Sequence, residues 1–411
     1  MRMESPQNRP RVSAKSARFT ESVIREMTRL AMRYGAINLA QGFPNFPAPE
    51  EVKLAACRAI AEDCNQYSIT WGARSLREAI AERYSTVYGA PVDPETEITV
   101  CCGATEAMIA TLLAVVDPGD EVIIFEPFYE NYGPDAILCG ARPRYVRLHP
   151  PDWSFDPAEL AAAFGPAVRA VVLNTPHNPT GRVFTPDELR YIGALCERWG
   201  ALLITDEIYE AIVYDGRTHC SPAALPALRP RTVVVNGVSK TYSVTGWRIG
   251  WCIAPADITA AIRKVHDFLT VGAPAPLQEA AAVALRLAAS YYQRLAADYQ
   301  RRRDVLIPLL EHAGFRCWVP QGAYYVMTDI SGFGYTDDVA FARYLVEHIG
   351  VAAVPGSSFY ARPADGQQQI RFAFCKTLDL LEEAGRRLAR LRELPDATPA
   401  SGAPGAGDHS V

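Results

Sequence analysis

Residues 232–251, TVVVNGVSKTYSVTGWRIGW, contain the pattern that decides the fold. They start as an apolar, β-branched run that is typical of a buried strand, and they continue into a Ser-, Thr- and Gly-rich turn that carries Lys240 and Arg248. Similar runs come earlier in the chain at 97–100, 120–127, 170–174 and 201–207. Longer helical patterns separate these runs, and such alternation predicts an α/β fold with a mostly parallel sheet.

Each of these runs is followed by residues that can do chemistry. The segments are CCGATEA at 101–107, EPFYENY at 126–132, TPHNPTG at 175–181, DEIYE at 206–210 and SKTYSVTGWR at 239–248. The loops after parallel strands converge at one edge of the sheet, and ligands bind there. We therefore expect these segments to form one site.

The pattern changes after about residue 286. A long Arg- and Ala-rich helix is predicted over 284–314, followed by short strands within 322–330 and 367–374 and by closing helices. This favours a second, smaller α+β domain, with a substrate cleft between the domains. We predict a flexible tail at 1–17, a segment packing on the small domain at 18–48, a large domain at 49–285, a small domain at 286–394 and a disordered tail at 395–411.

Composition limits the classes of function. The formal net charge of −5 argues against nucleic acid as a partner and favours a small-molecule substrate. The ten cysteines lack a CxxC pair or metal-ligand spacing, so we expect reduced thiols and no metal. The start of the chain lacks the apolar centre of a signal peptide, and no apolar run is as long as a membrane span. We expect a soluble cytoplasmic protein that does not bind membranes.

Lys240 is the central candidate, and it is one of only five lysines in the chain. A lysine amine that is partly desolvated near other cations has a lowered pKa and can form a Schiff base with an aldehyde. Arg248, eight residues later in a Gly-flanked turn, could clamp a phosphate through two hydrogen bonds. The alternative for Lys240 alone is an ordinary solvated lysine.

Asp206 stands where an apolar strand should end, and its carboxylate could pair with a protonated ring nitrogen. A helix N-cap is the alternative role for this residue. Tyr209 could hydrogen-bond a phenolic oxygen on the same ring, or belong to the core. Asn178, in a turn set by two prolines and a glycine, could bind that oxygen or a substrate carboxylate, or be structural.

The remaining candidates would bind anions or a flat ring. Gly103, Ala104 and Thr105 open a predicted helix, so their N–H groups would face an incoming anion. Tyr129 could stack on a ring or pack in the core. Arg371 lies inside an alternating strand, where it should meet an anion, either a structural carboxylate or the α-carboxylate of a substrate. Together the candidates describe an aromatic, phosphorylated aldehyde with a basic nitrogen.

These residues are similar to those of the fold-type I pyridoxal-phosphate enzymes, the class I/II aminotransferases, over about 18–392. The resemblance is carried by NPTG at 178–181, DEIYE at 206–210, SKTYSVTGWRIGW at 239–251 and IRFAF at 370–374. It implies an aspartate aminotransferase-like fold, with a mostly parallel seven-stranded sheet flanked by helices and a smaller α+β domain. It also implies pyridoxal 5′-phosphate bound to Lys240 as an internal aldimine, and a homodimer in which Tyr67 reaches the neighbouring subunit's phosphate.

Two stretches, INLAQGFPNFPAPE at 37–50 and EPFYENY at 126–132, resemble the branch of kynurenine aminotransferase/glutamine transaminase K and methionine aminotransferases. In that branch the backbone at Gly42 helps to hold the substrate carboxylate opposite Arg371. Ile24 and Tyr324 would border the substrate side chain.

This chain departs from the family pattern at three places. Gly237 stands where a serine that contacts the phosphate is common, and Thr105 stands where kynurenine enzymes often have a tyrosine. Ala273 and Pro274 replace an aromatic/His pair of that branch. These departures concern the substrate more than the fold or the cofactor.

The resemblance implies transamination between an α-amino acid and a 2-oxo acid, with the freed amine of Lys240 as general base. A PLP-dependent C–S β-lyase, or other PLP chemistry in a specialised biosynthetic pathway, would use the same residues. A ligand-sensing domain of a transcription regulator would need a DNA-binding module, for which the first 15 to 20 residues are too short. The identity of the amino donor stays open.

Overall fold

The computed structural model describes residues 11–393. The disordered tail that we predict at 395–411 lies outside the described residues, and so do residues 1–10 of the predicted N-terminal tail. Within 11–17, a 3₁₀ turn begins at Ser16, and the Lys15 side chain donates a hydrogen bond to the carbonyl of Leu138 at 3.0 Å.

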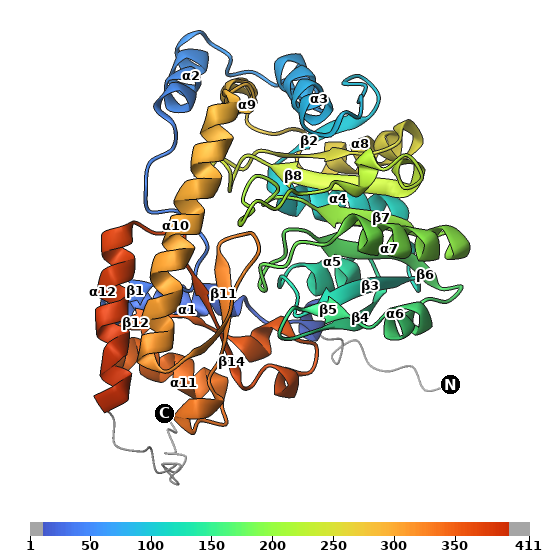
Figure 1. Ribbon diagram of the computed structural model, residues 1–411. Helices are drawn as coiled ribbons and strands as arrows, with labels where there is room; N and C mark the ends of the chain where they lie inside the picture. Colours follow the sequence, from blue (N-terminus) through green and yellow to red (C-terminus); the bar gives the residue numbers. More distant parts are fainter. Residues whose placement is uncertain (1–10, 394–411) are drawn as a thin grey trace.

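A large sheet runs down the right-hand part of the molecule in Figure 1, with strand order β2-β9-β8-β7-β6-β3-β4-β5. Its strands are β2 (Ile98–Cys101), β3 (Glu121–Glu126), β4 (Arg142–His149), β5 (Ser154–Phe155), β6 (Val168–Asn174), β7 (Leu202–Asp206), β8 (Thr232–Gly237) and β9 (Gly250–Ile253). The pairings from β8 through β7, β6 and β3 to β4 are parallel, while β9 runs antiparallel to both of its neighbours. The predicted α/β fold is therefore confirmed.

Helices cover both faces of this sheet. The helices of this part are α2 (Glu50–Ala61), α3 (Arg74–Tyr88), α4 (Gly103–Val115), α5 (Tyr132–Leu138), α6 (Pro157–Ala163), α7 (Pro186–Trp199), α8 (Ala256–Leu269) and α9 (Ala275–Leu285). Of these, α2 packs on α9 rather than on the sheet. Within β6, Val171 and Leu173 join one core cluster while Ala170 and Val172 join another. A strand buried on both faces is apolar throughout, which is why these runs lack polar alternation.

A smaller α+β part follows. Its four-stranded sheet has the order β10-β11-β14-β13, and β1 pairs in parallel with β12. The elements are α1 (Val23–Tyr34), β1 (Ile37–Asn38), α10 (Ala289–Ala313), β10 (Arg316–Trp318), β11 (Tyr325–Asp329), α11 (Asp338–Tyr344), β12 (Val351–Ala352), β13 (Val354–Pro355), β14 (Gln369–Ala373) and α12 (Leu378–Leu388). Figure 1 shows α10 running from beside the large sheet to the small one. The bounds that we give to the two domains remain predictions.

Two details differ from the sequence-based expectation. The large sheet has an eighth strand, β5, which pairs antiparallel with the edge strand β4 through two residues only. The single helix predicted over 284–314 is interrupted, because α9 ends at Leu285 and α10 begins at Ala289. Neither glycine nor proline marks this break. In the first turn of α10, the Tyr291 ring stacks on Tyr242 and its hydroxyl donates to the Thr241 carbonyl at 2.7 Å.

Within residues 11–393, no helix combines the length and apolar character that crossing a bilayer requires.

Candidate active site

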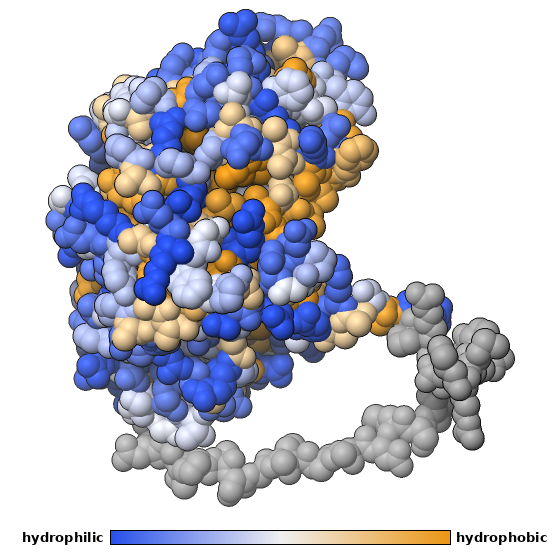
Figure 2. All heavy atoms as spheres, turned by 90° about the vertical axis from the view of Figure 1, so that its right-hand side faces the viewer, coloured by the Kyte–Doolittle hydropathy of each residue, from blue (hydrophilic) through white to orange (hydrophobic). Residues whose placement is uncertain are grey.

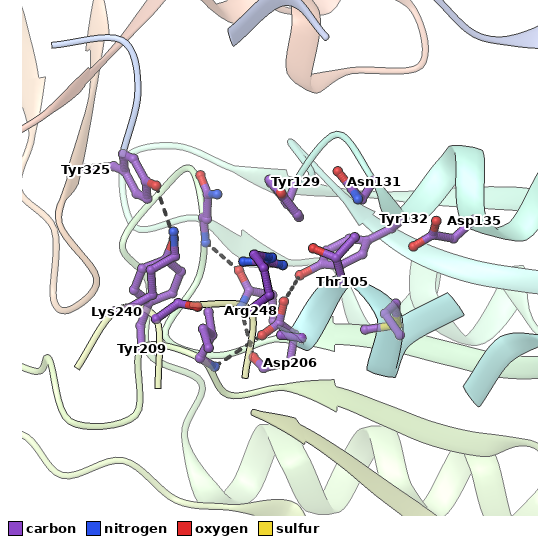
Figure 3. A pocket seen from close by; sticks show the side chains of 16 residues that line it. Thr105, Tyr129, Asn131, Tyr132, Asp135, Asp206, Tyr209, Lys240, Arg248 and Tyr325 are labelled. Atoms are coloured by element: carbon purple, nitrogen blue, oxygen red, sulfur yellow. Dashed lines mark hydrogen bonds between the residues drawn. The ribbon is translucent and has the colours of Figure 1, made fainter. Parts of the chain in front are cut away.

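The carboxyl ends of the parallel strands open into a pocket (Figure 3). The predicted residues that line it are Ala104, Thr105, Tyr129, Asn178, Asp206, Tyr209, Lys240 and Arg248. The pairing of Asn174 with Asp206, and of Asp206 with Val235, aligns the ends of β6, β7 and β8. The expectation that the segments after the strands form one site therefore agrees with the geometry.

Lys240 projects from the turn between β8 and β9. Its Nζ donates a hydrogen bond to the carbonyl oxygen of Gly42 at 3.2 Å. Burial lowers the pKa of the Lys240 amine to about 8, and the positive charges of Arg248 and Arg371 act in the same direction. The amine is therefore less basic than that of a solvated lysine, and about a tenth of it is unprotonated at pH 7.

Asp206 ends β7 and is buried. No helix follows it, so the alternative role as a helix N-cap does not apply. The Tyr132 hydroxyl donates to Asp206 Oδ2 at 2.7 Å, and the Ile208 N–H donates to Oδ1 at 3.1 Å. Burial raises the pKa of this carboxyl to about 6, while these two hydrogen bonds oppose the rise. Asp206 can therefore accept a strong hydrogen bond from a cationic N–H.

A small cradle lies at the start of α4. Gly103 has φ +83°, and a Cβ at this position would lie 2.3 Å from Arg248 Nη2. A Cβ on Gly250 would lie 2.4 Å from the backbone nitrogen of Ala104. The two glycines thus let the guanidinium and β9 approach the helix start, where backbone N–H groups have no partner within the helix. This arrangement suits a phosphate.

Arg371 lies on β14 and is fully buried. Nη1 donates to Asn178 Oδ1 at 2.8 Å, Nη2 donates to the Ala40 carbonyl at 2.8 Å, and Nε has no hydrogen-bond partner. Among residues 11–393 no carboxylate forms an ion pair with this guanidinium, so the alternative of a structural carboxylate partner is wrong. A buried cation with an unused donor is suited to bind a carboxylate.

Tyrosines and Gly42 close the pocket on the side of β11. The Tyr209 and Tyr325 hydroxyls are 3.1 Å apart, and the Tyr324 hydroxyl donates to the Gly42 carbonyl at 2.8 Å. A Cβ on Gly42 would lie 2.0 Å from the Tyr325 hydroxyl, so glycine is required at this close approach. The Gly42 N–H makes no hydrogen bond within residues 11–393.

Positions named from the sequence that are not among the lining residues include Gly42, Gly103, Tyr324 and Arg371, which adjoin the lining through the contacts described above, and Tyr67, Ile24 and Gly237. Tyr67 is 88 % exposed, so it serves no site within its own chain. Ile24 is buried on α1 within the core that includes β12. Gly237 is tightly enclosed, because a Cβ there would lie 2.8 Å from the Ile249 carbonyl oxygen. A serine side chain would not fit at Gly237 without a backbone shift.

Further residues line the pocket that were not among the candidates from the sequence: Met108, Asn131, Tyr132, Asp135, Asn174, Ile208, Ser239 and Tyr325. Four of them, Asn131, Tyr132, Ile208 and Ser239, lie within the segments expected to form the site, although none was singled out. A fifth, Asn174, is the last residue of a predicted strand. Tyr325 had no signal in the sequence, because alternation along a strand would turn its side chain away from that of its neighbour Tyr324.

The donor set fits pyridoxal phosphate residue by residue. Lys240 offers an amine of lowered pKa, Asp206 a buried carboxylate for the ring nitrogen, and the Gly103–Arg248 cradle a phosphate site. Tyr129 lines the space between them. No metal ion is needed to explain any of these groups.

Comparison with known proteins agrees with this geometry. Residues 34–388 match the family described as aminotransferase class I and II. The chain is 39 % identical to a probable N-succinyldiaminopimelate aminotransferase of Mycobacterium tuberculosis over 92 % of its length and 98 % of the relative. It is 38 % identical to the methionine aminotransferase of Escherichia coli, covering 90 % and 96 %. It is 36 % identical to human kynurenine–oxoglutarate transaminase 1, covering 88 % and 94 %.

A solved structure of the Mycobacterium tuberculosis N-succinyldiaminopimelate aminotransferase superposes with a TM-score of 0.90 at 38 % identity, covering 92 % of this chain and 100 % of that one. The resemblance to the methionine and kynurenine aminotransferase branch is confirmed. The chain therefore belongs to the class I and II aminotransferases, and it is a pyridoxal-phosphate-dependent enzyme that transfers amino groups.

Proposed function

We propose that this enzyme moves the amino group of an α-amino acid to a 2-oxo acid with Lys240 as the proton-transferring base, Asp206 as the partner of the cofactor ring and Arg371 as the carboxylate anchor. One observation carries the assignment. Residues from far-apart segments converge on one pocket, and beside it a fully buried arginine keeps an unused donor.

Pyridoxal phosphate supplies an aldehyde carbon to which amines attach and a protonated ring that withdraws electrons from the substrate's α-carbon. Lys240 does the proton transfer. Because its pKa is about 8, the amine can take a proton from the α-carbon and return it at neutral pH. Its hydrogen bond to the Gly42 carbonyl keeps Nζ on the side of the pocket where Tyr324 also points.

Asp206 holds the proton on the ring nitrogen. Its carboxylate is kept in place by Tyr132 and the Ile208 N–H, and burial strengthens its interaction with a cation. Tyr209 directs its hydroxyl toward Tyr325 in this structure, and it would donate to the phenolic oxygen of the ring. The Gly103, Ala104 and Thr105 N–H groups and Arg248 would hold the phosphate.

Arg371 and Asn178 bind the α-carboxylate of the substrate. The hydrogen bond between their side chains fixes the guanidinium plane, and the Arg371 Nε–H remains available. The free Gly42 N–H would donate from the opposite side. The substrate is thereby oriented with its α-carbon toward Lys240.

We propose a homodimer in which Tyr67 completes the partner's phosphate site. Tyr67 and Phe268 are 88 % and 92 % exposed in the single chain, and such exposed aromatics are typical of interfaces. Figure 2 shows apolar residues gathered in a band on one face of the molecule. Sedimentation analysis should give a mass near twice 45.0 kDa.

We place the reaction in the cytoplasm, which agrees with ten cysteines that are all free in the structure. The relatives named above act on N-succinyldiaminopimelate, methionine and kynurenine according to their names, and these compounds, with glutamine and aromatic amino acids, form the donor panel to test. β-Elimination has no observation in its favour.

The test is spectroscopic and chemical. Purified protein should show the visible absorbance of bound cofactor, and borohydride should fix the cofactor to the chain through Lys240. Each donor is then added with single oxo acids, and the amino and oxo acid products are quantified. The assignment fails if Lys240→Ala leaves the borohydride-fixed cofactor unchanged. Pyruvate and ammonia from a cysteine conjugate, without amino-group exchange, would indicate a lyase.

A further inference from the structure

A buried pair of ionisable residues outside the pocket lining joins two segments that matter for phosphate binding. Glu106, in the first turn of α4, accepts a hydrogen bond from His266 Nδ1 at 2.7 Å and one from Thr270 Oγ1 at 2.8 Å on its Oε1. His266 is fully buried on α8, and its Nε2 faces the Thr70 carbonyl at 2.8 Å. None of these residues has a role in the function proposed above.

The partners decide the protonation of the imidazole. A carbonyl oxygen can only accept, so Nε2 of His266 carries a proton toward Thr70. Nδ1 faces a carboxylate oxygen of Glu106, so the pair is an imidazolium with a carboxylate. Burial alone would lower the pKa of His266, but the hydrogen bond and charge of Glu106 outweigh it and raise the pKa. Asp267 adds to this rise, and His266 in turn lowers the pKa of Glu106 despite its burial.

Each end of this pair is attached to backbone that, in the function proposed above, carries a phosphate contact. Glu106 Oε2 accepts the N–H of Cys102, the residue just before α4, which leaves the next N–H groups to face the cradle of Arg248. At the other end, Thr70 lies three residues after Tyr67. The Trp71 carbonyl accepts the N–H of Val100 in β2, so the 67–71 segment is held beside the strand that leads into α4.

We propose that the Glu106–His266 ion pair is a positioning element that fixes the Tyr67 segment relative to the start of α4. The start of α4 binds the phosphate in the subunit's own active site, and Tyr67 contacts the phosphate in the partner's active site. The ion pair therefore couples these two phosphate contacts. The proposal rests on the proposed dimer. In this arrangement the ion pair of each subunit connects the two active sites of the dimer. Loss of the pair therefore weakens phosphate binding in both active sites.

A metal site is the competing interpretation, because Cys101, Glu106 and His266 offer ligand atoms within 4.8 Å of one another. The hydrogen bonds argue against it. Both nitrogens of His266 and both carboxylate oxygens of Glu106 already have close protein partners. The Cys101 thiol donates to the Thr99 carbonyl at 3.9 Å, and its hydrogen bond with Cys252 and its burial raise its pKa. An imidazolium is not a ligand.

The test compares two forms of the cofactor that differ only in the phosphate. Dissociation constants of pyridoxal phosphate and pyridoxal are measured for wild type, Glu106→Gln and His266→Gln, with Glu82→Gln, at the exposed Arg286–Glu82 pair, as the matched control. We expect each pair variant to bind pyridoxal phosphate about tenfold more weakly, about 1.4 kcal/mol, and pyridoxal unchanged within about twofold. A purely structural loss would weaken both forms alike, and that outcome overturns the proposal.

A double-mutant cycle with Tyr67→Phe tests the coupling itself. If His266 acts through Tyr67, the loss caused by Tyr67→Phe should be smaller in His266→Gln than in wild type. Additive losses overturn the coupling. Where a charge-changing variant does not fold, Thr270→Val removes one donor to the same Glu106 oxygen, and it should give a smaller loss, about threefold, with the same selectivity for the phosphate. Equal weakening of both cofactor forms by Thr270→Val counts against the proposal.

These results are distinguishable from a failure of the proposed function. If wild type does not become fixed to pyridoxal phosphate through Lys240 on borohydride treatment, the function itself fails. If wild type is fixed and prefers pyridoxal phosphate to pyridoxal while the pair variants keep that preference, only the positioning role fails.

Discussion

Replacing Arg371 by leucine should remove the enzyme's preference for substrates that carry an α-carboxylate. The guanidinium uses one Nη1 hydrogen for Asn178 and one Nη2 hydrogen for the Ala40 carbonyl. Nε–H and one hydrogen on each Nη stay available, enough for a two-bond contact with a carboxylate. At about 1.5–3 kcal/mol for each hydrogen bond to a charged group, the contact is worth about 3–6 kcal/mol. This corresponds to a loss of about 10²- to 10⁴-fold in kcat/KM.

The assay compares an amino acid with the amine that lacks only its carboxyl group. Wild type should prefer the amino acid by about this factor, and Arg371→Leu should treat the two nearly alike. Arg371→Lys keeps the charge but not the planar fork, so its preference should be intermediate. Cofactor absorbance and affinity serve as controls for folding, because the substitution leaves the Asn178 and Ala40 oxygens without this donor. If Arg371→Leu keeps the wild-type preference within about tenfold, the carboxylate is bound elsewhere and the reasoning is refuted.

The other predictions concern the cofactor side of the pocket. Tyr132→Phe removes a buried donor worth about 1.5–3 kcal/mol, so the pKa of Asp206 should rise by roughly one to two units from about 6. The pH dependence of cofactor affinity should shift upward by the same amount. An unchanged pH profile would contradict the role of this hydrogen bond. The lowered pKa of Lys240 is about 8, and only the unprotonated amine reacts with an aldehyde. The rate of cofactor binding to the apoenzyme, followed by stopped-flow absorbance, should therefore rise about tenfold per pH unit below pH 8 and level off above it. A rate that keeps rising to about pH 10 would show a lysine of ordinary pKa. Gly103→Ala places a methyl group 2.3 Å from Arg248 Nη2 at a φ of +83°, so pyridoxal phosphate should bind at least about tenfold more weakly. Titration with pyridoxal, which lacks the phosphate, should show a smaller loss of affinity. Equal losses of affinity for the two compounds would mean that the phosphate is bound elsewhere.

The sequence predicted the cofactor side of the site better than its surroundings, for a physical reason. Asp206 and Lys240 follow apolar strands directly, and strand ends in a parallel sheet share one edge, so a one-dimensional pattern locates them. Asn174, the last residue of β6, obeys the same rule. Tyr132 depends on a helix start at that residue, a boundary that sequence patterns locate poorly.

The substrate side could not be derived in this way. Gly42 meets Lys240 and Tyr324 only after the chain has folded back over long distances, and nothing in the local sequence specifies such contacts. The break between α9 and α10 lies just before Tyr291, which packs on Tyr242, and local helix propensity gives no sign of it. The Glu106–His266 pair joins α4 to α8 across 160 residues, and only the structure shows that two residues of ordinary type meet there.

The contacts of the N-terminal segment also set the order in which the two halves of the active site can form during synthesis. The last strand of the large sheet, β9, ends at Ile253, whereas the Ala40 carbonyl must wait for Arg371, 331 residues further along the chain. Closing so long a loop comes late in folding, because its entropic cost must be met before the contact is gained. In a chain that emerges from the ribosome, Asp206 and Lys240 can come together well before Arg371 reaches its place on β14. The residues proposed to hold the cofactor ring can thus come together before the residue proposed to bind the substrate carboxylate.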